Sequence, residues 1–214
     1  MSEQTLREEI VAVAQAIDRA GFCPSKSGNV SARFGDGLLI TPSGLPYAQT
    51  KPEDLIYLAL DGTVLGGSRK PSSEWPFHTE IYKARADAQA IVHTHSPRAT
   101  ALSCARRGIP AFHYMIALCG GADIRCADYA TFGSPELAAN AVRALDGRKA
   151  VLLANHGVIA LGATLAGAHT IVAEVENLAG QYLDLLASGL EPVILDAAEM
   201  ARVSKKFAGY GKVG

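Results

Sequence analysis

The sequence of 214 residues has no excess of charge of either sign and no long hydrophobic run. Its 20 Lys and Arg residues almost balance its 21 Asp and Glu residues, so we expect no basic face for nucleic acid. A run of 18 apolar residues is absent, and no membrane-spanning helix is therefore expected. A secretory signal peptide is not expected either, because the chain begins with polar residues and Glu8 and Glu9 interrupt any apolar segment.

Paired cysteine motifs, internal repeats and low-complexity linkers are also absent. The four cysteines have no Cys-x-x-Cys spacing: Cys23, Cys104, Cys119 and Cys126. This favours reduced, buried thiols in a cytoplasmic protein over disulfides or a thiolate metal site. The length suits one domain with a sizeable core. We therefore expect a single domain over residues 1–214, with a C-terminal tail from about residue 208 and a cytoplasmic location.

Helical and strand patterns alternate along the chain. A capping-box pattern formed by Thr5 and Glu8 precedes apolar residues at helical spacing, which predicts a helix over 6–20. Glycine-containing turns at 35–37 and 61–62 each separate two short apolar segments, which predicts two β-hairpins. Further helices are expected over 74–86, 98–106, 136–145, 164–187 and 197–207. Hairpins mixed with helices predict an α/β fold in which helices sandwich a central, largely antiparallel sheet.

Two histidines one residue apart end an apolar strand pattern at residues 90–95. Side chains alternate between faces in a strand, so His93 and His95 point the same way, about 6.5–7 Å apart along the chain. His156 follows a second apolar run, and Glu74 opens a predicted helix. Three imidazoles and one carboxylate form a zinc ligand set with one exchangeable position. The spacing alone is equally compatible with histidines that bind no metal.

Three segments of small residues accompany these metal-ligand candidates, at 27–29, 41–44 and 72–73. They offer hydroxyls, amides and backbone N–H groups. Ser72 and Ser73 lie at a predicted helix N-terminus, where N–H groups and the helix dipole favour an anion. Together the segments suggest a phosphate cradle built without lysine or arginine, although each is also typical of a turn or a helix cap.

Three other histidines have more ordinary interpretations. His78 lies one helical turn after Glu74 and offers a less favoured Glu-x-x-x-His ligand pair. His113, which precedes Tyr114, is expected to be structural. His169 is expected to pack or cap within its predicted helix.

Eight short strings resemble the class II aldolase/adducin family nearly from end to end. They are GNVS at 28–31, LITPSGLPY at 39–47, PSSEW at 71–75, IVHTH at 91–95, IPAFHYMIA at 109–117, YATFG at 129–133, NHG at 155–157 and KFAGYG at 206–211. The resemblance implies the family's α/β/α sandwich, assembled as a homotetramer with active sites between subunits. It also implies a phosphorylated sugar as substrate.

The resemblance also implies residue roles. One Zn²⁺ per subunit would be held by His93, His95 and His156, with Glu74 as fourth ligand before substrate binds. Glu74 would then act as catalytic base, and Tyr114 of a neighbouring subunit as catalytic acid toward the aldehyde oxygen. The implied substrate-binding residues are Gly28, Asn29, Ser43, Gly44, Ser72, Ser73, Phe132 and Tyr210.

The implied activity is cleavage of a ketose 1-phosphate, such as L-fuculose 1-phosphate, into dihydroxyacetone phosphate and an aldehyde. Cleavage of 5-deoxyribulose or methylthioribulose 1-phosphate differs only in the aldehyde. A pentulose-phosphate 4-epimerase would perform the same bond cleavage, but it commonly carries Asp where Glu74 stands. A non-enzymatic adducin-like module is disfavoured because it has no reason to keep a complete ligand set.

Overall fold

A mixed eight-stranded sheet forms the centre of the computed structural model, which describes residues 2–209. The strand order is β4-β3-β2-β1-β5-β8-β7-β6. The strands are β1 (Asn29–Phe34), β2 (Gly37–Ile40), β3 (Ile56–Ala59), β4 (Val64–Gly66), β5 (Ala90–Thr94), β6 (Arg125–Ala127), β7 (Ala150–Leu153) and β8 (Gly157–Gly162). All neighbouring strands pair antiparallel except β6 and β7, which are parallel. The predicted α/β class with a largely antiparallel sheet is confirmed.

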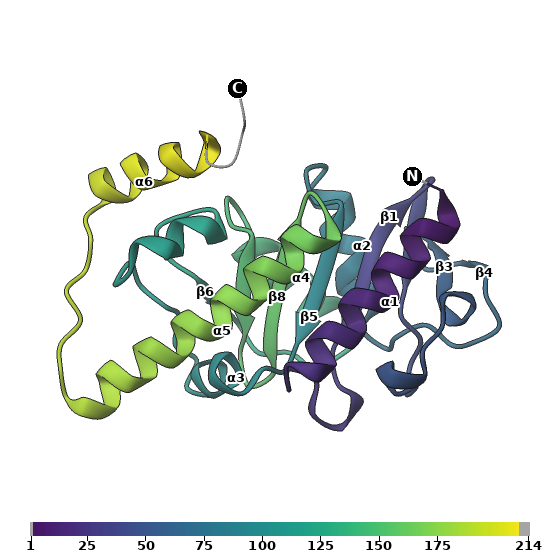
Figure 1. The fold of residues 1–214 in the computed structure, drawn as a ribbon, viewed down its shortest axis with the longest axis horizontal. Coiled ribbons are helices and arrows are strands. Elements are labelled where there is room, and N and C mark those ends of the chain that lie inside the picture. Colours follow the sequence, from purple (N-terminus) through teal and green to yellow (C-terminus); the bar gives the residue numbers. More distant parts are fainter. Residues whose placement is uncertain (1, 210–214) are drawn as a thin grey trace.

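Helices cover both faces of this sheet (Figure 1). They are α1 (Glu3–Arg19), α2 (Trp75–Ala84), α3 (Pro97–Cys104), α4 (Pro135–Ala144), α5 (Leu165–Ser188) and α6 (Ala197–Gly209). Successive residues of β5 belong to different hydrophobic clusters. Ala90 and Val92 pack with α1, α3 and α5, whereas Ile91 packs with α2 and α4. This alternation gives the sandwich its two apolar layers.

Helix starts follow the capping side chains. The α1 helix begins earlier than predicted because Ser2 caps it: the Ser2 hydroxyl accepts the N–H of Thr5 at 3.1 Å. Thr5 therefore lies inside the helix, and the predicted capping box with Glu8 is wrong. Ser134 accepts the N–H of Leu137 in the same way at the start of α4.

The end of the chain departs from the compact sheet sandwich. A segment over 189–196 leads from α5 to α6, which packs against the short 3₁₀ helix η4 (Tyr114–Cys119) (Figure 1). The sequence patterns did not predict η4 or β6, since both are too short to show periodicity. None of the helices within residues 2–209 has the length and apolar character that a membrane crossing requires.

Candidate metal centre and substrate pocket

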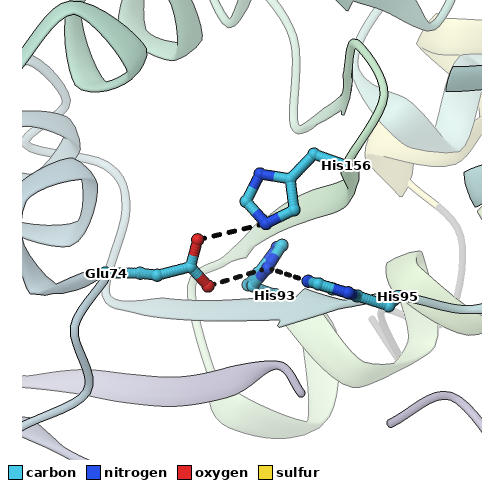
Figure 2. Close-up of side chains that lie close together, drawn as sticks. All are labelled: Glu74, His93, His95 and His156. Atoms are coloured by element: carbon cyan, nitrogen blue, oxygen red, sulfur yellow. Dashed lines mark hydrogen bonds and ion pairs between the residues drawn. The ribbon is translucent and has the colours of Figure 1, made fainter. Parts of the chain in front are cut away.

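The four metal-ligand candidates meet at one point (Figure 2). Nε2 of His93 lies 3.1 Å from Oε2 of Glu74 and 3.0 Å from Nε2 of His95. Nε2 of His156 lies 3.1 Å from Oε1 of Glu74, and all four ligand atoms lie within 4.8 Å of one another. A tetrahedral zinc site with bonds of about 2.0–2.1 Å places its ligand atoms about 3.3 Å apart. The cluster therefore has the size of a single metal site.

The sheet order brings these residues together from distant parts of the sequence. His93 lies near the end of β5, and His95 follows that strand directly. His156 lies in the turn between β7 and β8, and β8 is the neighbour of β5. Glu74 is the residue at the N-terminal cap of α2, which packs over the same sheet.

Hydrogen bonding and charge keep the cluster in a metal-binding form. Nδ1 of His93 donates to the backbone oxygen of Val158 at 2.9 Å, which leaves Nε2 with its lone pair toward the cluster. Burial acts to raise the pKa of the Glu74 carboxyl, but the His93 and His156 side chains outweigh burial and hold this pKa below its usual range. Burial, followed by the charges of His93 and His156, lowers the pKa of His95 to about 3.

One polar atom in the cluster is unsatisfied. Oε1 of Glu74 is buried without a hydrogen-bond donor within the described residues, although a histidine nitrogen lies nearby. A divalent cation among the four ligand atoms would satisfy this oxygen together with the imidazole nitrogens that face it. These residues therefore fit a divalent metal ion.

A cavity of about 270 Å³ opens beside the cluster. Glu74, His95 and His156 form part of its wall. The predicted substrate-binding residues that lie within 2–209 also line it: Gly28, Asn29, Ser43, Gly44, Ser72, Ser73 and Phe132. At Gly28, with φ of +85°, a Cβ atom would lie 2.7 Å from the backbone oxygen of His93, so only glycine fits this approach. The structure thus brings the small-residue segments to one place beside the metal cluster.

The cavity also contains residues that the sequence analysis missed. Lys26 is the one Lys or Arg among the described lining residues, so the cradle does not lack a cation. Tyr129 and Asn155 line it as well. Ser25 and Lys26 both have positive φ, 56° and 66°, which is uncommon for residues other than glycine. No sequence pattern predicts such a turn, and its closeness to Gly28 is the one feature of the sequence that points to Lys26.

Two predicted site residues lie elsewhere. Tyr114 does not line the cavity; it is half exposed on η4 and stacks against Phe207 of α6, with ring centroids 6.4 Å apart. A separate groove of about 1090 Å³ runs beside Tyr114 and α6. Tyr210 lies outside the described residues. The chain by itself therefore does not bring Tyr114 to Glu74.

The other histidines agree with the favoured interpretations. Nδ1 of His113 accepts the N–H of Met115 at 3.2 Å and caps η4, which confirms a structural role. His78 is not part of the metal cluster. It is fully buried and hydrogen-bonded to Ser31 and Asn29. His169 is half-buried within α5.

Comparisons with known proteins agree with this geometry. The sequence model of the family described as Class II Aldolase and Adducin N-terminal domain matches residues 8–183. A 5-methylthioribulose-1-phosphate/5-deoxyribulose-1-phosphate aldolase of Rhodospirillum rubrum is 50% identical, over 98% of this chain and 94% of its own length. An L-fuculose phosphate aldolase of Escherichia coli (strain K12) is 43% identical, over 99% of this chain and 98% of its own. A solved L-fuculose 1-phosphate aldolase structure covers 97% of this chain and 98% of its own, with a TM-score of 0.93 and 40% identity.

Proposed function

This chain belongs to the class II aldolase and adducin family and is a class II aldolase, and we propose that it reversibly cleaves a ketose 1-phosphate into dihydroxyacetone phosphate and an aldehyde. The observation that carries this proposal is the position of Glu74. Its carboxylate belongs to the metal cluster and also lines the cavity with the serine hydroxyls. A base, a metal site and an anion-binding surface therefore meet around one small volume.

We propose Zn²⁺ as the metal, held by His93, His95, His156 and Glu74. Three imidazoles and a carboxylate are ligands that zinc prefers. When bound there, Zn²⁺ would act as a Lewis acid that polarises the substrate carbonyl and acidifies the neighbouring C–H bond.

The phosphate group of the substrate would bind in the part of the cavity that the small-residue segments line. Ser72 and Ser73 directly precede Glu74 and α2, and both line the cavity, so they offer hydroxyls to an anion beside the positive end of the helix dipole. Ser43 and Gly44 contribute a hydroxyl and backbone groups from the loop after β2. Lys26 adds a positive charge, which offsets the repulsion between the phosphate and the Glu74 carboxylate.

Glu74 is the proposed base. Its carboxylate lies in the metal cluster and also lines the cavity, where it can take the proton from the C–H bond beside the carbonyl. For the aldehyde oxygen we propose Tyr114 of a neighbouring subunit as acid, because Tyr114 is exposed and lies outside its own chain's cavity. This requires an oligomer with sites between subunits, for which we propose a homotetramer, and Tyr210 would also contribute to these sites.

The aldehyde half of the substrate is where the similar aldolases differ. We place 5-methylthioribulose or 5-deoxyribulose 1-phosphate first and L-fuculose 1-phosphate second, since the R. rubrum enzyme shares 50% of its residues with this chain and the E. coli enzyme 43%. The exposed rings of Tyr129 and Phe132 and the buried Ala130 form an apolar part of the cavity wall, which suits a methyl or methylthio group. This order reverses the one that the family resemblance alone implies, in which L-fuculose 1-phosphate comes first. We also propose a cytoplasmic location, in keeping with four free cysteines.

A condensation assay tests the proposal. The zinc-loaded protein is incubated with dihydroxyacetone phosphate and, separately, with methylthioacetaldehyde, acetaldehyde, lactaldehyde or glycolaldehyde, and the initial rates are compared. We expect the first two aldehydes to react fastest. Fastest reaction of lactaldehyde would support L-fuculose 1-phosphate instead, and isomerisation of a pentulose phosphate without release of aldehyde would indicate an epimerase. Absence of both activities in zinc-loaded oligomer would refute the enzymatic proposal.

A further inference from the structure

A chain of buried hydrogen bonds connects Glu74 to the interior of the protein. Nδ2 of Asn29 donates to Oε2 of Glu74 at 3.0 Å, and Oδ1 of Asn29 lies 2.5 Å from Nε2 of His78. Nδ1 of His78 lies 2.6 Å from Oγ of Ser31, which in turn lies 2.9 Å from Oη of Tyr82. Asn29, Ser31, His78 and Tyr82 are each no more than 2% exposed. Water therefore does not compete for these groups.

Two secondary-structure elements build this chain by simple spacing. Glu74, His78 and Tyr82 are four residues apart and lie along one side of α2 and its cap. Asn29 and Ser31 are two residues apart in β1 and point to the same face of the sheet. The strand side chains thus alternate with the helix side chains along one line. Asn29 also pairs with the metal-ligand candidate His93 across β1 and β5.

The charge of Glu74 fixes the direction of every hydrogen bond in the chain. An ionised carboxylate only accepts, so Asn29 must present its amide NH₂ to Glu74 and its oxygen to His78. His78 must then donate from Nε2, which leaves Nδ1 to accept the hydroxyl hydrogen of Ser31. Oγ of Ser31 accepts in turn from Tyr82. Each donor points toward Glu74, and such chains polarise cooperatively in a low-dielectric interior.

We propose that His78 is a positioning residue for the base Glu74. By donating from Nε2 to Asn29, it holds the Asn29 amide in the one orientation that donates to Oε2 of Glu74. A flipped amide would set its oxygen against the carboxylate. Ser31 and Tyr82 act one step behind, because they hold His78 in the required tautomer. This inference rests on the proposed function, in which Glu74 removes the C–H proton.

The position of Oε2 of Glu74 matters because this oxygen has two roles in the proposed function. It lies beside Nε2 of His93 in the metal cluster. It is also one of the two carboxylate oxygens that would accept the proton from the substrate. The amide donor restrains this oxygen whether or not it also contacts the metal. Loss of partners that orient a metal ligand typically costs about 10–100-fold in metal affinity or activity.

The first test is spectroscopic and needs no substrate. Long-range ¹H–¹⁵N NMR on the zinc-loaded protein reports which nitrogen of His78 carries the proton. We expect a neutral ring protonated at Nε2. A ring protonated at Nδ1, or at both nitrogens at neutral pH, would overturn the inference whatever the enzyme does. In Ser31→Ala we expect the His78 signals to move, since Nδ1 loses its donor.

The second test uses exchange of the dihydroxyacetone phosphate C–H proton with deuterated water, which requires no aldehyde. His78→Leu should lower the maximal exchange rate about 10–100-fold at nearly unchanged KM for dihydroxyacetone phosphate. His78→Gln should recover most of the rate, because its amide NH₂ can replace Nε2–H as donor to Asn29. Zinc content is measured alongside and should stay near one per chain in both variants.

Thr79→Val is the matched control. It removes a buried hydroxyl from the residue after His78 in α2. This hydroxyl donates to the backbone oxygen of Pro76 and takes no part in the hydrogen-bond chain from Glu74 to Tyr82. Its exchange rate should equal the unmutated rate. Equal losses in His78→Leu and Thr79→Val would show a merely structural role, and no loss in His78→Leu would also overturn the inference. If His78→Leu does not fold, Ser31→Ala must slow exchange for the inference to stand. Absence of exchange in the unmutated enzyme would instead refute the proposed function. The tautomer measurement would then decide the inference about His78.

Discussion

Lys26 offers a direct test of the proposed phosphate binding in this cavity. It is the one cationic side chain among the described residues that line the cavity. Two unit charges about 4 Å apart gain about 1 kcal/mol in water. Because Lys26 is exposed, this water-like value applies rather than the larger one for an interior. A doubly charged phosphate then gains about 1–2 kcal/mol, which corresponds to a factor of about 5–30.

We therefore expect Lys26→Gln to raise KM for dihydroxyacetone phosphate about 5–30-fold in the C–H exchange assay, with little change in the maximal rate. Glutamine keeps an unbranched stem, so it faces a similar conformational cost at the positive φ of this position. Lys26→Arg is the control that keeps the charge. The interaction is exposed, so the difference between Lys26→Gln and the unmutated enzyme should shrink as salt increases toward 1 M.

Two results would refute this reasoning. An unchanged KM in Lys26→Gln at low salt would mean that the ammonium group does not contact the phosphate. A reduced maximal rate with unchanged KM would mean that Lys26 acts on the reaction rather than on binding. A thermal-shift titration with inorganic phosphate gives the same comparison without catalysis, and the phosphate-induced stabilisation should be weaker in Lys26→Gln.

Four further outcomes follow from the site. The purified protein should contain about one zinc per chain, and removing it with a chelator should abolish exchange; full activity of metal-free protein would contradict the metal site. Glu74→Gln should keep the fold and much of the zinc but lose most C–H exchange, and exchange at the unmutated rate would remove Glu74 from the mechanism. Tyr114→Phe should leave C–H exchange largely intact and slow condensation about 10²–10⁴-fold. If the tyrosine acts across a subunit boundary, verified mixed oligomers of Glu74→Gln and Tyr114→Phe subunits should regain activity. Burial lowers the pKa of His78 to about 3. Between about pH 6.5 and 3 the unfolded protein therefore binds a proton at His78 that the folded protein does not. The free energy of unfolding accordingly falls as the pH falls through this window. In urea unfolding of the metal-free protein, the free energy of unfolding should fall less steeply with falling pH in His78→Gln than in the unmutated protein, by about 1 kcal/mol per pH unit. Parallel pH profiles of the two proteins would contradict this prediction.

The local part of this fold was readable from the sequence. Helical spacing identified most of α1 and α5, and glycine turns identified both hairpins. The His-x-His strand also predicted that His93 and His95 share one face, since this follows from the period of two in any strand. Each of these features depends on residues close together in the sequence.

The remaining features depend on pairings between distant segments. No pattern within β8 states that it lies beside β5, yet this pairing brings His156 to His93. The Lys26 turn was missed because positive φ at two residues other than glycine has no sequence signature. Spacing alone left His78 as a second ligand candidate for the metal. The structure instead places it one turn further along α2, where β1 and not the metal cluster lies opposite.

The register between β1 and β5 links the proposed base to the metal-ligand candidates. Asn29 pairs with His93, so the strand that orients Glu74 is held directly beside the strand that carries the metal ligands. Glu74 in turn occupies the N-cap position of α2, beside the serines of the proposed phosphate cradle. In the proposed function, the groups that the shared three-carbon phosphate requires are therefore held by strand ends, the turns beside them and one helix start. In our proposal the aldehyde half meets exposed side chains such as Phe132 and a neighbouring subunit. Substitutions at Tyr129 or Phe132 should thus change the ranking of aldehydes while leaving C–H exchange on dihydroxyacetone phosphate nearly unchanged.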